Sequence, residues 1–394
     1  VRTMDPRLIT RVLWTRRQLL RRDRWTRAQL EAHQASSLQE LRTHAYSTSS
    51  FYQRFHRGLG DKPLHELPVL TKQMVMNSFD RLVTDPHVRL HELEAFLAQT
   101  DGSERFLGRY FVNATSGSTG KRGIFLFDPR EWSAILASYA RSYAWAGVTP
   151  GLTTSVKTAV VSTTTPWHQS AMVGASVQSP FVPTLRLNAT EPLEHLVAEL
   201  NAFQPEALIG YPSVVRLLAE ARLSGQLKIT PRAVLTAAEV LTEETKRRIR
   251  KAWGRVPFNV YGATETATIA SECEHHRSHL FEDLVITEVV DETNRPVPVG
   301  EYGAKVLVTV LFSRTLPLIR YEMSDSIRLG AGDCACGRPY ALVQDIQGRH
   351  EEVLELPGAK GDTVKVHPNV FHDALDLLPV GGWQVVEEPG GLMV

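Results

Sequence analysis

Strand-like and helix-like segments alternate through the middle of this chain, and that alternation restricts its fold more than any other feature. Short β-rich runs occur at 110–113, 123–127, 156–162, 207–210 and 233–236. Helical patterns occupy 129–146, 193–203 and 242–253, and Asp128 and Thr242 stand where N-caps are expected. The sequence therefore predicts a mixed α/β fold with a largely parallel sheet.

The regions on either side of this alternation have different patterns. Residues 1–60 read as helical, and 284–310 contain short β runs that favour an antiparallel sheet or a small barrel. We expect one large domain over 1–348. Residues 349–394 would form a hinge and an incomplete small α+β domain.

Charge and composition exclude several classes of protein. The 394 residues carry a net charge of +1, which gives no global field for nucleic acid or a membrane surface. No apolar run approaches the roughly 18 residues of a membrane span, and the start lacks the apolar core of a signal peptide. We expect a cytoplasmic protein that binds neither nucleic acid nor membrane.

Arginine is concentrated near the start of the chain. Nine arginines lie between Arg2 and Arg27, interleaved with Leu8, Val12, Leu19 and Trp25. This pattern predicts a basic amphipathic helix. The helix could bind an acidic partner or carrier, or simply pack on the main domain with a solvated face.

The run 115–123 (TSGSTGKRG) combines hydroxyls, glycines and cations in nine residues. Glycines allow successive backbone N–H groups to point into one concavity, and Lys121 or Arg122 supplies charge for phosphate oxygens. It is not a Walker A loop, because Arg122 follows the lysine where a hydroxyl is required. Taken alone, such a run is more often a surface turn.

Three further motifs follow this loop in the sequence: 259–266 (NVYGATET), 318–325 (LIRYEMSD) and 345–349 (DIQGR). In order and separation, the four motifs resemble those of the adenylate-forming superfamily of acyl-CoA ligases, adenylation domains and luciferases. Within it, 67–72 (LPVLTK), 236–239 (TAAE) and 334–338 (CACGR) resemble the phenylacetate-CoA ligase-like family. The resemblance covers about residues 40 to 360 and implies an ATP-dependent, AMP-forming acid ligase.

The resemblance also implies a role for each motif. The loop would cradle the β- and γ-phosphates of ATP through Thr115, Ser116, Gly117, Ser118, Thr119, Gly120 and the catalytic Lys121. Thr264 would touch the α-phosphate, and Glu265 would hold Mg²⁺, a hard cation that prefers oxygen ligands. The remaining cofactor-binding positions are Ala237, Ala238 and Glu239 along the adenine, Tyr261 stacked on it beside Gly262, Asp325 at the ribose, and Arg349 near the pivot.

The acid itself is less defined. Residues 165–170 (TPWHQS) resemble the place where many members carry a gate to the acyl pocket, so Trp167 and His168 are expected to contact the acid together with Tyr211. Trp132 and Tyr139 add to an aromatic set that favours an aryl acid over a long acyl chain. A histidine beside a tryptophan is nevertheless often structural.

Three functions stay open, and they differ in what accepts the activated acid and in whether the protein is a catalyst at all. Coenzyme A is the first expected acceptor; an amine or a carrier-protein thiol is the alternative. A nucleotide-binding protein that has lost catalysis is the third.

The family's mobile C-terminal domain normally continues further than the 45 residues after Arg349, and it carries a lysine used in adenylation. Lys360 and Lys365 lie too close to the hinge to replace it. At the hinge, family members often carry two aspartates after the arginine, whereas residues 348–352 (GRHEE) carry two glutamates. The charge is the same, but the acidic side chains are longer. Family habit favours a homodimer.

The cysteines offer a candidate metal site. Cys334 and Cys336 lie on one short turn, and Cys273 and His279 lie about sixty residues upstream. Three thiolates and one imidazole form a closed tetrahedral zinc set with a structural role. His275 and His276 are rival ligands, and three buried free thiols are the alternative.

Overall fold

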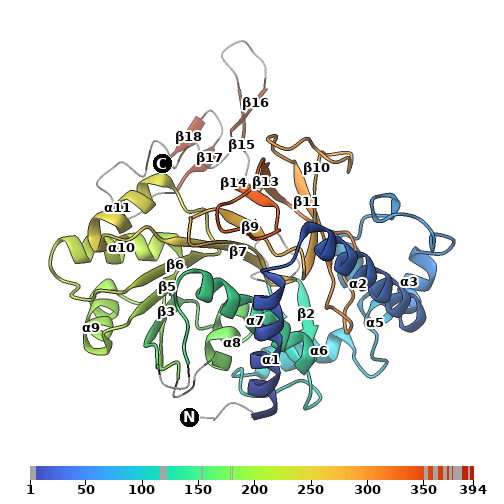
Figure 1. The fold of residues 1–394 in the computed structure, drawn as a ribbon, viewed down its shortest axis with the longest axis horizontal. Coiled ribbons are helices and arrows are strands. Elements are labelled where there is room, and N and C mark those ends of the chain that lie inside the picture. The colour runs from blue at the N-terminus through green and yellow to red at the C-terminus, as the bar shows by residue number, and fades with distance from the viewer. Residues whose placement is uncertain are drawn as a thin grey trace.

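A nine-stranded sheet forms the centre of the part of the chain that the structure describes (Figure 1). The structure is a computed structural model that describes residues 6–115, 122–151, 154–177, 179, 181–349, 354–357, 363–366, 371, 375, 384–388 and 391–394. The helices are α1 (Pro6–Arg22), α2 (Arg27–Thr48), α3 (Ser50–Phe55), α4 (Lys72–Asn77), α5 (Phe79–Leu82), α6 (Leu90–Gln99), α7 (Pro129–Trp145), α8 (Gln169–Val177), α9 (Leu193–Phe203), α10 (Pro212–Leu223) and α11 (Glu243–Trp253), with a 3₁₀ turn at Leu64–Glu66.

The strands, in chain order, belong to five sheets. They are β1 (Phe111–Ala114), β2 (Ile124–Phe127), β3 (Thr158–Ser162), β4 (Thr184–Asn188), β5 (Ala207–Gly210), β6 (Ala233–Ala237), β7 (Phe258–Ala263), β8 (Ala267–Glu272), β9 (Ser278–Leu280), β10 (Val285–Val290), β11 (Lys305–Val310), β12 (Tyr321–Met323), β13 (Asp325–Gly330), β14 (Leu342–Arg349), β15 (Leu354–Pro357), β16 (Thr363–Val366), β17 (Val386–Glu388) and β18 (Gly391–Met393).

The central sheet changes direction at β7. Its strand order is β13-β14-β9-β8-β7-β6-β5-β3-β4. The strands from β4 to β7 are parallel, and those from β7 to β13 are antiparallel. The predicted mixed fold is confirmed. The parallel half comprises the alternating segments of the sequence, whereas the antiparallel half comes from later strands that the alternation did not include.

Helices cover both faces of the parallel half. On one face, α9, α10 and α11 pack through Leu200, Val215, Leu218 and Ile249 onto side chains such as Val161 of the sheet. Helices α7 and α8 lie on the other face. The strands have apolar residues on both sides because both of their faces are covered.

Helix α7 begins where the sequence predicts. The Asp128 side chain accepts hydrogen bonds from the backbone N–H groups of Arg130 and Glu131, at 2.7 and 2.9 Å. Glu131 returns a bond by accepting from the N–H of Asp128, so the two side chains form a capping box with Pro129 at the first turn. Thr242 caps α11 in the same manner, accepting from the N–H of Thr245 at 3.2 Å.

The N-terminal region is helical, as expected, and α1 packs along α7. Leu8 and Leu19 of α1 are buried, at 4% and 1% exposure. Beneath the end of α1, the fully buried Arg141 of α7 forms two hydrogen bonds to the carboxylate of Asp283, at 2.9 and 3.0 Å. Asp23 joins this network by accepting from the indole of Trp145 at 2.8 Å. The C-terminal end of α1 is therefore attached to a buried polar network.

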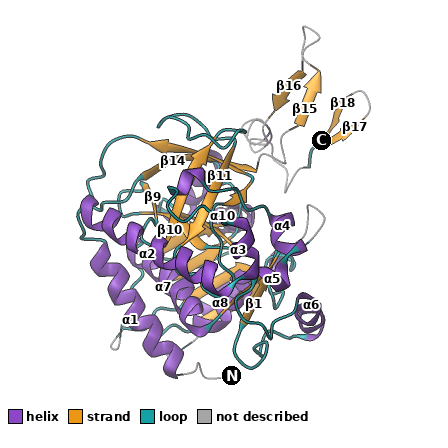
Figure 2. Ribbon diagram, turned by 90° about the vertical axis from the view of Figure 1, so that its right-hand side faces the viewer, coloured by secondary structure: helices purple, strands orange, loops and turns teal. Residues whose placement is uncertain are grey.

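Two smaller elements complete the fold. Strands β10, β11 and β12 form the antiparallel sheet that the pattern at 284–310 indicates. The hairpins β15–β16 and β17–β18 stand away from the main body (Figure 2). No helix of the described residues has the length and apolar character to cross a bilayer.

Candidate functional site

A cavity of about 1230 Å³ is lined by the central sheet and by residues of α4, α7, α8, α10 and α11, and it contains most of the predicted site residues. Those that line it are Thr115, His168, Tyr211, Ala237, Ala238, Glu239, Tyr261, Gly262, Thr264, Glu265, Asp325 and Arg349. They come from widely separated segments, which converge because β6, β7, β13 and β14 belong to one sheet. Arg349 lies opposite Asp325 in the β13–β14 register.

Two tyrosine–carboxylate pairs occupy this cavity. The hydroxyl of Tyr261 donates to Asp325 Oδ2 at 2.9 Å, and that of Tyr321 donates to Glu265 Oε1 at 3.3 Å. Burial raises the pKa of Glu265, and the negative charge of Asp325 adds to that effect. Burial also raises the pKa of Tyr261 well above its ordinary value, with Asp325 again adding to it. Two carboxylates in one enclosed space favour a bound cation.

Gly262 has a steric reason for its place in the motif. A Cβ at this position would lie 2.7 Å from the carbonyl oxygen of Ala267, on the neighbouring strand β8. The backbones of β7 and β8 approach closely where their register shifts, between Tyr261 and Gly262. This irregularity precedes the turn that presents Thr264 and Glu265 to the cavity.

Lys72 is a cavity residue that the sequence motif contained but to which no role was assigned. The segment before it is fixed on β12, because the N–H of Leu70 donates to Arg320 O and the N–H of Glu322 donates to Leu70 O. The charge of Lys72 opposes the burial that raises the pKa of Glu265. Lys72 could have been found in the run 67–72, but that run was used only as evidence for the family resemblance.

Gln169 is a second residue that sequence reasoning missed. It is buried, and its Oε1 accepts from the hydroxyl of Tyr139 at 2.9 Å. Its Nε2 donates to the backbone oxygen of Thr264 at 3.2 Å. Gln169 thus connects α7 with the turn at Thr264 and Glu265. Gln169 lies in the run 165–170 that resembles the acyl gate, but its role was not predicted, because both of its partners are distant along the chain.

Glu239 and Ala238 have structural features beyond lining the cavity. The Glu239 carboxylate accepts from the backbone N–H and the hydroxyl of Ser213, at 2.9 and 3.0 Å, so it caps the start of α10. Ala238 has φ of +72°, in the left-handed region where a Cβ is unfavourable. The backbone therefore turns sharply at the position predicted to face adenine.

The predicted acid-binding residues are divided by the structure. Tyr139, His168 and Tyr211 line the cavity. Burial lowers the pKa of His168, which favours its neutral imidazole. Trp167 lies outside the lining, with the guanidinium of Arg122 4.0 Å from its ring centre.

Trp132 is wholly buried, which corrects the expectation that it contributes to the acid pocket. Its ring stacks on Phe111, with the ring centres 4.8 Å apart. It faces the β1–β2 hairpin because α7 directs this position away from the cavity.

The central part of the phosphate loop, from Ser116 to Lys121, lies outside the described residues. Its two ends are joined, since the N–H of Thr115 donates to Gly123 O and the N–H of Gly123 donates to Thr115 Oγ1, each at 2.9 Å. Thr115 lines the cavity. The loop is therefore closed at its base beside the carboxylate pairs.

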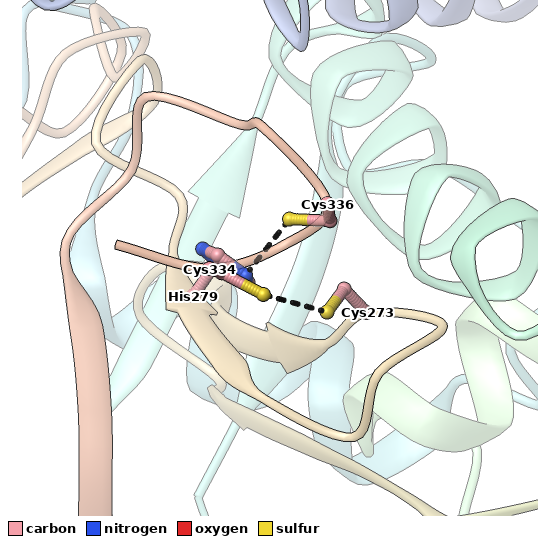
Figure 3. A group of neighbouring side chains, drawn as sticks. All are labelled: Cys273, His279, Cys334 and Cys336. Atoms are coloured by element: carbon pink, nitrogen blue, oxygen red, sulfur yellow. Dashed lines mark hydrogen bonds between the residues drawn. The ribbon is translucent and has the colours of Figure 1, made fainter. Parts of the chain in front are cut away.

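The three cysteines and His279 form a compact group where the end of β8 and strand β9 meet the segment before β14 (Figure 3). Their ligand atoms all lie within 4.8 Å of one another. The Sγ atoms of Cys273 and Cys334 are 3.6 Å apart, and Cys336 Sγ lies 3.3 Å from His279 Nε2. Tetrahedral zinc with Zn–S bonds of about 2.3 Å would place two sulfurs about 3.8 Å apart, so the spacing fits.

Second contacts orient the imidazole of this group. His279 Nδ1 lies 3.2 Å from the backbone oxygen of Tyr340, which directs Nε2 at the sulfurs. The rival ligand His276 instead pairs with Glu272 at 3.2 Å and stacks on Phe258. The compact group of the described residues therefore has the predicted membership.

Comparison with known proteins agrees with this geometry. The sequence profile of the AMP-binding enzymes matches residues 109–308. A phenylacetate-coenzyme A ligase of Thermus thermophilus is 28% identical over 72% of this chain and 63% of its own length. A fumarate–(S)-2,3-diaminopropanoate ligase of Enterobacter agglomerans is 23% identical over 58% of this chain and 57% of its own. This chain thus spans less than two thirds of the length of either relative.

A solved structure shares the fold. The crystal structure of 2-hydroxyisobutyryl-CoA ligase in the postadenylation state gives a TM-score of 0.75 at 22% identity. The match covers 94% of this chain and 78% of that one.

Proposed function

Because the chain belongs to the AMP-binding enzyme family, we propose that it activates a small carboxylic acid with ATP and passes the acyl group to coenzyme A. One observation carries this proposal. Thr115, Glu265 and Asp325, which are far apart in the sequence, line a single cavity. A carboxylate that attacks the α-phosphorus needs its charge neutralised and both reactants held in line, and such a cavity can supply both.

Each group in the cavity receives a role in this proposal. Lys72 and the phosphate loop, including Lys121, would neutralise the triphosphate. Glu265 would hold Mg²⁺, and the hydrogen bond from Tyr321 would orient its carboxylate. Asp325 would accept the ribose hydroxyls, because Tyr261 occupies Oδ2 with one hydrogen bond and fixes the group. Thr264 would lie at the α-phosphate, in a turn that Gln169 holds.

The acid would enter the part of the cavity between α7, α8 and the sheet. This part is lined by Tyr139, Tyr143, Val160, Val173 and Ile209. Flat aromatic and branched apolar side chains suit a small aryl acid, which buries its ring on them. The relative named a phenylacetate-coenzyme A ligase supports this choice.

An amine acceptor is the second candidate, and a specific finding favours it. One relative is named a ligase of fumarate and (S)-2,3-diaminopropanoate, and the second of these compounds carries amino groups. The activated acyl group could thus leave to nitrogen instead of to the thiol of coenzyme A. The adenylation step would be the same in both cases.

We also propose that Cys273, His279, Cys334 and Cys336 bind one structural zinc ion. All four positions of a tetrahedral site would be filled by protein ligands, which leaves none for water or substrate. The ion would join the β8–β9 turn to the segment before β14. Its role would be stability, with no part in adenylation.

Pyrophosphate exchange tests the main proposal. Purified protein with Mg²⁺, ATP and labelled pyrophosphate should form labelled ATP only when a suitable aryl acid is added. Lys72→Met should reduce this exchange, while Lys62→Met, an exposed lysine paired with Glu66, should leave it unchanged. Consumption of the acid with coenzyme A, but not with amines, would separate the two acceptors. Absence of exchange with every acid, in protein that still binds ATP, would support a catalytically inactive nucleotide-binding protein.

A further inference from the structure

The outward face of α1 is basic along its whole length and has an exposed tryptophan in its middle. Arg7, Arg11, Trp14, Arg17 and Arg21 follow the three- and four-residue spacing of one helical face, and all are exposed. Trp14 is 63% exposed, and its neighbour Leu13 is 55% exposed. The 17 residues of α1 include no aspartate or glutamate. Tryptophan is enriched at interfaces between water and an apolar phase, because its ring is apolar and its N–H is polar.

The opposite face holds the helix firmly. Leu8 and Leu19 are buried against the core, and Arg22 lies 3.5 Å from the buried carboxylate of Asp283. The next residue, Asp23, accepts from the indole of Trp145. Because α1 is fixed on this side, Trp14 cannot turn inward without releasing the helix from α7.

The charge of this face differs from the rest of the molecule. Nine arginines and only two aspartates lie in the first 27 residues, yet the whole chain has a net charge of +1. The remaining residues therefore carry a net negative charge. Within the described part of the chain, Arg11, Arg17 and Arg21 form no ion pair. An anionic surface would attract α1, repel the rest, and so orient the molecule.

We propose that α1 attaches the protein to an anionic lipid surface, which departs from the expectation, based on the net charge of the whole chain, that the protein does not bind a membrane. Tryptophan and leucine exposed among arginines are the composition of helices that lie at a lipid interface. Trp14 and Leu13 would enter the headgroup region, and the flanking arginines would reach the lipid phosphates while their methylene groups stay near the apolar boundary. Each arginine near such a surface strengthens binding about fivefold. This inference is independent of the reaction proposed above.

Sedimentation with vesicles tests it. Vesicles of phosphatidylcholine mixed with phosphatidylglycerol should carry the 394-residue chain into the pellet at low salt, and vesicles of phosphatidylcholine alone should not. Binding should weaken as salt is raised, because the attraction is screened. In the bound state, the tryptophan emission should shift to shorter wavelength, and Trp14→Phe should remove most of that shift.

Charge reversal supplies matched variants. The triple variant Arg11→Glu, Arg17→Glu, Arg21→Glu should bind anionic vesicles about a hundredfold more weakly, with its melting temperature little changed. The control Arg250→Glu, Lys251→Glu, Arg255→Glu makes the same charge change at exposed positions in and after α11 and should bind as the parent does. Equal losses in both triples would show that binding reflects total charge only and would overturn the proposal.

Two other outcomes would also overturn it. Absence of pelleting with anionic vesicles at low salt would exclude a lipid surface. If Trp14→Ala converted a dimer to a monomer in analytical ultracentrifugation, the face would be an interface between copies of this chain.

Discussion

The backbone of Ala238, at the edge of the cavity, has an unfavourable conformation. Its φ of +72° places a Cβ in the left-handed region, at a cost of about 1 kcal/mol. We expect Ala238→Gly to raise the free energy of unfolding by about that amount, as measured by chemical denaturation. Ala237→Gly, one residue earlier at the end of β6, is the control and should lower it instead. A loss of stability in both variants would contradict this account.

Glu265 is the residue whose removal should affect the proposed chemistry most directly. Glu265→Gln keeps the shape but removes the charge that would hold Mg²⁺, so acid-dependent pyrophosphate exchange should fall at least about a hundredfold. The control Glu322→Gln changes a carboxylate of the same cavity that is already paired with Lys305. Exchange that survives in Glu265→Gln at ordinary Mg²⁺ concentration would remove Glu265 from the metal site.

Single residues were predictable where a motif names them and were missed where tertiary contacts define them. Thr264, Glu265 and Asp325 stand in motifs, and all three line the cavity. Gln169 could not be predicted, because its role depends on Tyr139 and on a backbone oxygen 95 residues away.

At the scale of elements, the buried pair of Arg141 and Asp283 joins α7 to the segment after β9. Burial alone would raise the pKa of Asp283, but the Arg141 guanidinium more than reverses this, and the pKa lies below its ordinary value. The ionised carboxylate therefore contributes stability above the unfolded pKa of about 3.9 and loses it as the pH falls through the lower folded value.

Asp283→Asn should accordingly cost about 3–5 kcal/mol near neutral pH, because it leaves Arg141 buried without a counter-charge. It should also flatten the acid side of the stability profile, measured by denaturation at several pH values. The control Glu31→Gln breaks an exposed pair with Arg27 and should cost about 0.5 kcal/mol or less. An unchanged acid slope in Asp283→Asn would assign that slope to other carboxylates.

The cysteine group links two elements that are distant in the sequence. If zinc is bound there, elemental analysis of protein purified without chelator should give one zinc per chain. A strong chelator should then lower the melting temperature and make the three thiols reactive together. Cys336→Ser should reproduce the loss of stability, whereas His275→Ala, outside the group, should not. Less than stoichiometric metal with slow, unequal thiol reactivity would favour free cysteines.

The positions of helices could be predicted from capping residues and hydrophobic periodicity. Which strands lie next to each other in the sheet could not. Asp128 and Thr242 mark helix starts that the structure confirms to the residue. The mixed fold was predicted, but not which strands pair: β9 and β14, for example, are joined only through Ser278 and His279 opposite Val343 and Leu342. Such short pairing leaves no pattern in the sequence of either strand.

For the whole molecule, bound ligands should stabilise the folded state. An ATP analogue with a suitable aryl acid, each at about a hundred times its dissociation constant, should add about 2.7 kcal/mol per independently bound ligand. Differential scanning fluorimetry with a panel of acids would detect this as a rise in melting temperature. Acids that bind only in the presence of the analogue would show that the two parts of the cavity are coupled. A panel without any nucleotide-dependent rise would argue against a shared cavity for both ligands.

The reversal of strand direction at β7 also has a consequence for how the protein matures. Tyr261 comes from the strand where the parallel half ends, and its partner Asp325 comes from the far edge of the antiparallel half. A nascent chain can thus complete the first half of its sheet while the ribosome still holds the second. During refolding, nucleotide binding should therefore appear after the helical circular dichroism signal has recovered. The time at which binding appears would report the last stage of folding.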